Sequence, residues 1–217
     1  MLLIVLPLVV AFTATAIYSK NIACLICQMN LFRTFAAIMI RKVTVEDAQA
    51  IADIYNEYVR KSVVTFEIEP VTLQEMRQRI DELSAGYPYW VYEDDGWVLG
   101  YCYAHQWKER AASRYTWETA VYVDVSARGK GIGRALVSHL IEECRRAGVH
   151  VLVACIVSEN EGSIRLHRRL GFKQVSHFYQ VGRKFGRWLD ILDFQLLLQE
   201  DTQDGECHVE DSCADMR

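Results

Sequence analysis

Apolar residues recur at two spacings from residue 39 onward, and the spacing predicts which segments are helical. In the helical segments they return every three or four residues, as one buried helix face requires. Thr44 and Thr72 stand directly before two such segments and can cap them, and Glu75 completes a capping box with Thr72. The predicted helices are the segments that follow Thr44 and Thr72, and 134–147 and 162–170.

The remaining ordered segments are rich in β-branched and aromatic residues, which is typical of strands. Asp95-Gly96 between two of them is a strong hairpin signal. The predicted strands are 40–43, 89–93, 97–105, 116–125, 150–157, 172–179 and 189–198. The segment 150–157 is apolar almost throughout, so we expect burial on both faces. Strands that first follow one another and later alternate with helices predict an α/β fold. Its central, mixed and mostly antiparallel twisted sheet should carry helices on both faces.

The two ends of the chain differ from residues 39–199, which we expect to form the domain. Residues 1–38 open on an uncharged apolar run long enough to cross a bilayer, without the basic start of a secretory signal. A membrane anchor, a weak signal peptide and a start-site artefact are all open, and we favour Met39 as the true start. The acidic residues 200–217 have little to bury and are predicted to be disordered.

Composition narrows the class of protein. The net charge of −4 does not suggest binding to nucleic acid. The seven cysteines show no disulfide pattern, so a reducing, cytoplasmic setting is expected. Cys24 and Cys27 lack a second ligand pair, so no metal site is predicted. Cys102, Cys144 and Cys155 are expected to pack in the core.

The segment 128–134, Arg-Gly-Lys-Gly-Ile-Gly-Arg, follows a predicted strand and precedes a predicted helix. Its three glycines allow left-handed backbone angles and close approach of a ligand. The unpaired N–H groups of the helix start and the side chains of Arg128, Lys130 and Arg134 would suit a pyrophosphate. A tight turn with solvated basic residues is the alternative, and the spacing excludes a P-loop.

Two motifs together carry a more specific resemblance. Arg128-x-x-Gly-x-Gly133 after Val121-Tyr-Val is followed by Asn160-x-x-Ser-Ile-x-Leu-His-x-x-Leu-Gly-Phe172. With the segments 107–118 and 181–190, this resembles the phosphinothricin/methionine sulfoximine branch of the GNAT acetyltransferase superfamily. The resemblance covers 39–199. It implies transfer of an acetyl group from acetyl-CoA to the amine of a small amino acid analogue such as phosphinothricin, methionine sulfoximine or methionine sulfone, without a metal.

The resemblance also implies which residues hold acetyl-CoA. The backbone of a strand would pair with the pantetheine arm, a glycine loop would hold the pyrophosphate, and a side chain after a later strand would bind the pantetheine end. These residues are Val121, Tyr122 and Val123 on the strand; Arg128, Gly129, Lys130, Gly131, Ile132, Gly133 and Arg134 in the loop; and Asn160.

The acceptor amine arrives as an ammonium ion and must lose a proton before it attacks. By the same resemblance Glu118 would be the general base, and His167 either the acid for the leaving thiolate or a residue that orients the substrate. The expected substrate-binding residues are Phe66, Lys108, Arg110, Arg114, Glu118, Thr119 and Ala120. The basic ones among them suit a carboxylate or phosphinate. Residues 183–188 would lie in a homodimer interface.

Two other functions stay open at this point. A protein or peptide N-terminal acetyltransferase would use the same fold with an open groove. An acyl-CoA-binding regulatory module would bind the thioester without turnover, held at a membrane only if 1–38 are translated and retained.

Overall fold

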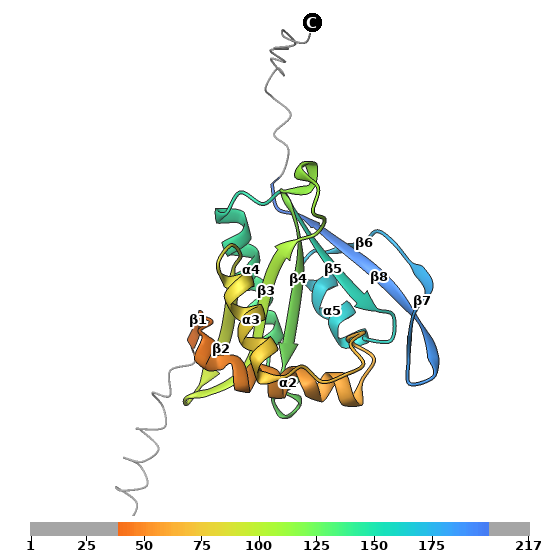
Figure 1. Cartoon of the computed structure of the whole chain (residues 1–217). Coiled ribbons are helices and arrows are strands. Elements are labelled where there is room, and N and C mark those ends of the chain that lie inside the picture. Colours follow the sequence, from red (N-terminus) through yellow and green to blue (C-terminus); the bar gives the residue numbers. More distant parts are fainter. Residues whose placement is uncertain (1–38, 200–217) are drawn as a thin grey trace, which may run out of the picture.

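Antiparallel pairing builds the first half of the sheet in the computed structural model, which describes residues 39–199 (Figure 1). The strands are β1 (Met39–Lys42), β2 (Tyr89–Asp94), β3 (Trp97–Gln106) and β4 (Thr116–Val123), and each pairs antiparallel with its neighbour. Asp95 and Gly96 turn between β2 and β3 with φ of 51° and 79°, which confirms the predicted hairpin. β4 ends at Val123 rather than 125, because Asp124 accepts a hydrogen bond from the Ser126 N–H at 2.7 Å and starts a 3₁₀ turn.

The second half of the sheet begins where β4 meets β5 (Val151–Val157) in parallel. β8 (Arg187–Leu197) runs antiparallel to β5, and β6 (Lys173–Gln174) and β7 (Phe178–Lys184) both pair with β8. The order is β1-β2-β3-β4-β5-β8-β6, with β7 beside β8. The expected mixed, mostly antiparallel sheet is confirmed.

The prediction of one strand over 172–179 is wrong. The chain forms the two-residue β6, leaves the sheet, and returns as β7, which forms a hairpin with β8. Phe185 and Gly186 make the turn with φ of 49° and 76°. Most side chains of β7 are exposed, so no alternation of apolar and polar residues marks it in the sequence.

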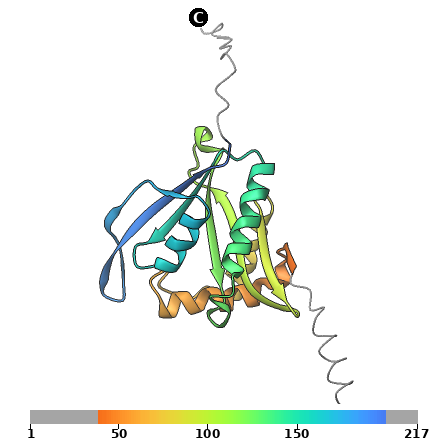
Figure 2. The same cartoon turned by 180° about the vertical axis from the view of Figure 1, so that it is seen from behind.

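Helices cover both faces of the sheet, as expected (Figures 1 and 2). On one face, α2 (Ala48–Lys61) and α3 (Leu73–Ser84) pack on β2, β3 and β4. On the other face lie α4 (Ile132–Arg146) and α5 (Glu161–Arg169). The predicted capping box of α3 is present, since Glu75 N–H donates to Thr72 Oγ1 at 3.2 Å and Thr72 N–H donates to Glu75 at 2.7 Å.

α2 and α3 do not reach across the sheet to β5 and β8, and this explains one wrong expectation. Cys102 and Cys144 are buried as predicted, but Cys155 on β5 is exposed. Its side chain points to the face that those helices leave open. The predictions for residues 1–38 and 200–217, and for the cysteines within them, concern parts of the chain that the structure does not describe. Within 39–199, no helix is both long enough and apolar enough to cross a membrane.

Candidate active site

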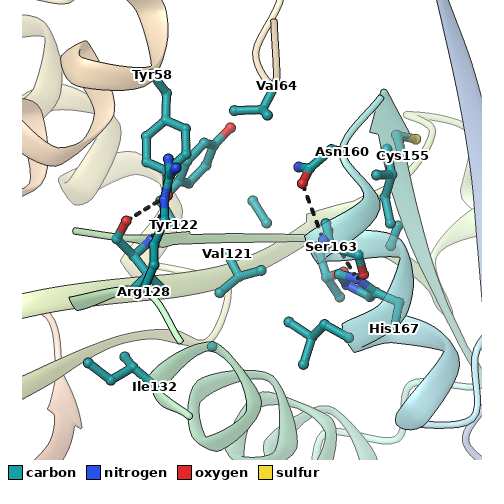
Figure 3. Close-up of a pocket in the computed structure, with 18 of the residues that line it drawn as sticks. Tyr58, Val64, Val121, Tyr122, Arg128, Ile132, Cys155, Asn160, Ser163 and His167 are labelled. Atoms are coloured by element: carbon teal, nitrogen blue, oxygen red, sulfur yellow. Dashed lines mark hydrogen bonds between the residues drawn. The ribbon is translucent and has the colours of Figure 1, made fainter. Parts of the chain in front are cut away.

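A cavity of about 710 Å³ opens where β4 and β5 separate. The two strands pair only from Thr116 opposite Val151 to Glu118 opposite Val153, and beyond that point β4 has no strand beside it on this side. The cavity is lined from both faces of the sheet, by Glu118, Ala120 and Cys155 on one and by Val121, Ala154 and His167 on the other. A ligand can therefore pass through the gap between the strands (Figure 3).

The glycine loop forms one end of this cavity. Gly129 and Gly131 have φ of 78° and 85°, as the sequence analysis expected. Gly133 has another role, because it lies within α4 and a Cβ there would stand 3.4 Å from Leu166 of α5. α4 begins at Ile132, two residues before the predicted start, so the N–H groups of its first turn lie beside the loop. This end can bind an anion by main-chain donors and the helix dipole.

Pleating decides which backbone groups of β4 face the gap. Asp124 N–H donates to the Leu99 carbonyl oxygen at 2.8 Å, and hydrogen-bonded positions alternate along an antiparallel pair, so the backbone of Tyr122 also bonds to β3 and faces away from the gap. Val123 faces the gap, but the Tyr58 hydroxyl of α2 accepts from its N–H at 3.3 Å and donates to its carbonyl oxygen at 2.6 Å. Of the three residues expected to pair with pantetheine, Val121 alone has its backbone directed into the gap and not bound by Tyr58.

Asn160 and His167 lie on the opposite wall (Figure 3). The Asn160 side-chain oxygen caps α5 by accepting from Ser163 N–H at 3.2 Å, and its amide nitrogen remains a donor for a ligand. His167 is 2% exposed, and its Nδ1 lies 2.9 Å from the Ser163 carbonyl oxygen. Since a carbonyl only accepts, Nδ1 carries the proton. Burial lowers the pKa of His167, against the effect of this bond, so the ring is neutral at pH 7 and Nε2 is an acceptor.

Glu118 stands at the last paired position of β4, half-buried and beside the gap. His105 of β3 is directly opposite it in the sheet, and Cys155 follows Val153, its partner on β5, by two residues. All three side chains lie on the face that holds α2. Partial burial and the Glu118 carboxylate raise the pKa of the Cys155 thiol. A carboxylate at the mouth of a gap suits proton removal from an incoming amine.

Comparison with known proteins agrees with this geometry. A family model described as an acetyltransferase (GNAT) domain matches residues 40–192. The chain belongs to the GNAT acetyltransferases.

Several relatives of this acetyltransferase are close over most of their length. An L-methionine sulfoximine/L-methionine sulfone acetyltransferase of Salmonella typhimurium is 42% identical over 167 residues, which cover 74% of this chain and 95% of the relative. A phosphinothricin N-acetyltransferase of Alcaligenes faecalis is 41% identical over 73% of this chain and 82% of its own. A solved structure of an acetyltransferase from Salmonella typhimurium with its cofactor acetyl-CoA has a TM-score of 0.74 and 41% identity, covering 79% of this chain and 99% of that chain.

The cavity of this acetyltransferase brings together most of the predicted site. The predicted residues that line it are Glu118, Thr119, Ala120, Val121, Tyr122, Val123, Arg128, Gly129, Gly131, Ile132, Gly133, Asn160 and His167. Arg128 stacks on the Tyr58 ring with its guanidinium carbon 4.7 Å from the ring centre. Lys130 and Arg134 are exposed beside the glycine loop and do not line the cavity.

Four predicted substrate residues lie elsewhere in the described chain. Lys108, Arg110 and Arg114 are exposed in the loop at the start of β4, the end remote from the glycine loop, and do not line the cavity. Lys108 lies over Trp107 and Arg114 over Tyr115, with charge-to-ring distances of 4.6 and 4.5 Å. Phe66 packs on β7 instead, and its neighbour Val64 lines the cavity.

Sequence reasoning missed other lining residues, among them Tyr58, Val64, Tyr103, His105, Cys155 and Glu159. Tyr58 could not be identified because nothing in the spacing of a helix separates a core tyrosine from one whose hydroxyl reaches a strand edge. Glu159 follows β5 as Asn160 does, and Arg187 of β8 binds it at 2.8 and 2.9 Å. Its position directly before Asn160 was the feature of the sequence that could have identified Glu159.

Proposed function

We propose that this acetyltransferase moves the acetyl group of acetyl-CoA to the α-amine of a small amino acid analogue of the phosphinothricin, methionine sulfoximine or methionine sulfone type. The observation that carries the proposal is the Glu118 carboxylate at the mouth of the gap between β4 and β5. The substrates named for the relatives at 41–42% identity support the acceptor class.

Glu118 would take a proton from the substrate ammonium group, so that the amine attacks the thioester carbonyl. The oxygen of that carbonyl then becomes negative and needs a donor. The Val121 N–H would supply it, since its backbone faces the gap. Collapse of the resulting intermediate breaks the C–S bond, forms the amide and releases the second proton of the amine nitrogen, and the expelled CoA thiolate takes up a proton.

The residues present fit acetyl-CoA. Main-chain N–H groups at the start of α4 and the Arg128 guanidinium would hold the pyrophosphate, and nothing lies within 4 Å of where Cβ atoms would stand at Gly129 and Gly131. The Val121 carbonyl oxygen would accept a hydrogen bond from the pantetheine arm, and the Asn160 amide would donate to the far end of that arm. The thioester itself supplies an activated acetyl group.

For His167 the geometry favours orientation over acid catalysis. A neutral ring whose only N–H is bound to Ser163 has no proton to give to the thiolate. We propose that Nε2 accepts a hydrogen bond from the ligand and that the thiolate takes its proton from solvent.

A homodimer would complete the acceptor side. Among the described residues that line the cavity, Arg128 is the only Lys or Arg, and it belongs to the end with the glycine loop. A substrate carboxylate near Glu118 would therefore meet a basic group of a second copy, such as one of the exposed side chains of 107–115. The exposed aromatic residues of the β7–β8 hairpin, Phe178, Tyr179, Phe185 and Trp188, would lie in the interface. We place the enzyme in the cytoplasm, as its free cysteines suggest.

Release of the CoA thiol by the purified full chain tests the proposal. The amines are methionine sulfoximine, phosphinothricin, methionine sulfone and a peptide with a free N-terminus. Turnover of the small amines is expected. Preference for the peptide would favour an N-terminal acetyltransferase, and binding of acetyl-CoA without turnover of any amine would favour a regulatory module.

A further inference from the structure

The loop between α2 and α3 lies beside the β7–β8 hairpin, far along the chain (Figure 1). A buried ammonium group ties the two together. Lys184 at the end of β7 is 4% exposed, and its Nζ donates to the Thr65 carbonyl oxygen at 2.8 Å. A lysine is rarely buried to this degree unless it is paired. The contact joins residues 119 positions apart.

Thr65 is held from a second side as well. Its hydroxyl shares a hydrogen bond with the Tyr55 hydroxyl of α2 at 2.8 Å. The preceding residue, Val64, lines the cavity (Figure 3). Lys184 and Tyr55 thus hold Thr65 between a strand and a helix, directly beside a residue of the cavity wall.

Phe66, on the other side of Thr65, packs against the hairpin without any spare room. A Cβ atom at Gly182 of β7 would lie 2.2 Å from Cε2 and 2.4 Å from Cζ of the Phe66 ring. A side chain at this position would displace the end of the Phe66 ring, which is 37% exposed, from β7. Glycine at 182 therefore leaves room for this ring, and its backbone angle is not the reason for it.

The charged surroundings keep Lys184 in place. Burial lowers the pKa of its ammonium group, and the Glu67 carboxylate opposes that effect. Glu67 is in turn paired with Arg79 of α3 at 2.7 Å. Removing the ammonium group would leave the Thr65 carbonyl oxygen without its donor, so the cost of the change falls on the contact that positions the loop.

We propose that Lys184 is a positioning residue for the acceptor site. Together with the Gly182–Phe66 contact it sets Val64 as a wall that restricts the cavity to the side chain of a single amino acid. This inference rests on the proposed function, because the wall matters only for an amine that enters from the side of Glu118. The cofactor end of the cavity does not depend on it.

Steady-state kinetics of the full chain, with methionine sulfone as the probe amine, test the positioning role. Lys184→Met should raise the KM for the amine about tenfold or more, with kcat and the Kd for acetyl-CoA changed by less than about threefold. Gly182→Ala should give the same pattern without removing a charge. Lys173→Met on the exposed β6 is the matched control and should match the wild type.

Hydrogen exchange at the amides of 63–67 gives a second measurement that needs no substrate. Lys184→Met and Gly182→Ala should lose protection there, while Lys173→Met should not. If the wild type acetylates none of the amines, the proposed function fails. The exchange measurement still tests whether Lys184 and Gly182 hold the loop in place. Unchanged protection and an unchanged amine KM in both variants would overturn the inference, and so would an equal loss of acetyl-CoA affinity.

Discussion

Replacing Glu118 by glutamine removes the carboxylate and keeps the shape of the side chain. The Glu118 side chain is half-buried at the edge of an open cavity. We therefore expect the fold to remain intact. The Kd for acetyl-CoA should also remain, because the glycine loop and Asn160 lie on other elements.

The magnitude follows from the protonation of the substrate. An amine with a pKa of about 8–10 is neutral in about one molecule in ten to one in a thousand at pH 7. A positioned base typically contributes about 10²–10⁴-fold, so kcat/KM of Glu118→Gln should fall by about this factor at pH 7, or by about 2.7–5.4 kcal/mol in barrier height.

A pH series of CoA-thiol release separates base catalysis from misfolding. Without the base, kcat/KM should rise about tenfold per pH unit until the amine is neutral on its own, so the deficit shrinks at high pH. Glu82→Gln on the exposed side of α3 is the control and should behave as the wild type. A variant with wild-type turnover at pH 7, or with a deficit that does not change with pH, would refute the role of Glu118.

Three other predictions concern stability and reactivity. Tyr58→Phe should lower the free energy of unfolding by about 1–2 kcal/mol in urea titrations, because two hydrogen bonds to Val123 are lost; an unchanged midpoint would contradict this. Burial alone would raise the pKa of Asp47, but Arg41 and the Thr44 N–H outweigh it and lower the pKa. The Asp47 carboxylate therefore stabilises the fold fully above its unfolded pKa, near about 4, and this stabilisation is lost as the pH falls through the lower pKa of the folded state. Asp47→Asn should lower the free energy of unfolding by about 2–4 kcal/mol at pH 7 and by less in acid. Because its pKa is raised, Cys155 should react slowly with iodoacetamide at pH 7, faster at pH 9, and more slowly again with acetyl-CoA bound, as mapped by peptide mass spectrometry; equal labelling with and without acetyl-CoA would place it outside the acetyl-CoA site.

The fold was predictable wherever one local signal dominated. Asp95-Gly96 fixed the β2–β3 hairpin, and the capping box at Thr72 fixed the start of α3. β7 escaped prediction because its exposed side chains carry no apolar alternation and its turn uses a phenylalanine, Phe185, in a left-handed conformation. Only Gly186 pointed to that turn.

The motifs predicted which segments form the site, but not which backbone groups of β4 face the gap. Tyr122 and Val123 belong to the right strand, yet pleating directs one toward β3 and Tyr58 binds the other. Cys155 was expected in the core because β5 is apolar on both faces. Whether a helix covers a given face depends on the lengths and packing of α2 and α3, which no pattern within β5 contains.

The short pairing between β4 and β5 also bears on rigidity. Three residues on each strand join the two halves of the sheet along this seam, and past them the halves diverge. A ligand that binds between β4 and β5 beyond these three residues takes the place of the hydrogen bonds that the strands no longer make with each other. It therefore joins the two halves of the sheet as well as contacting its own surroundings. Occupancy raises the free energy of unfolding through linkage, by about 2.7 kcal/mol at a hundred times the Kd of the ligand, and the melting temperature rises with it.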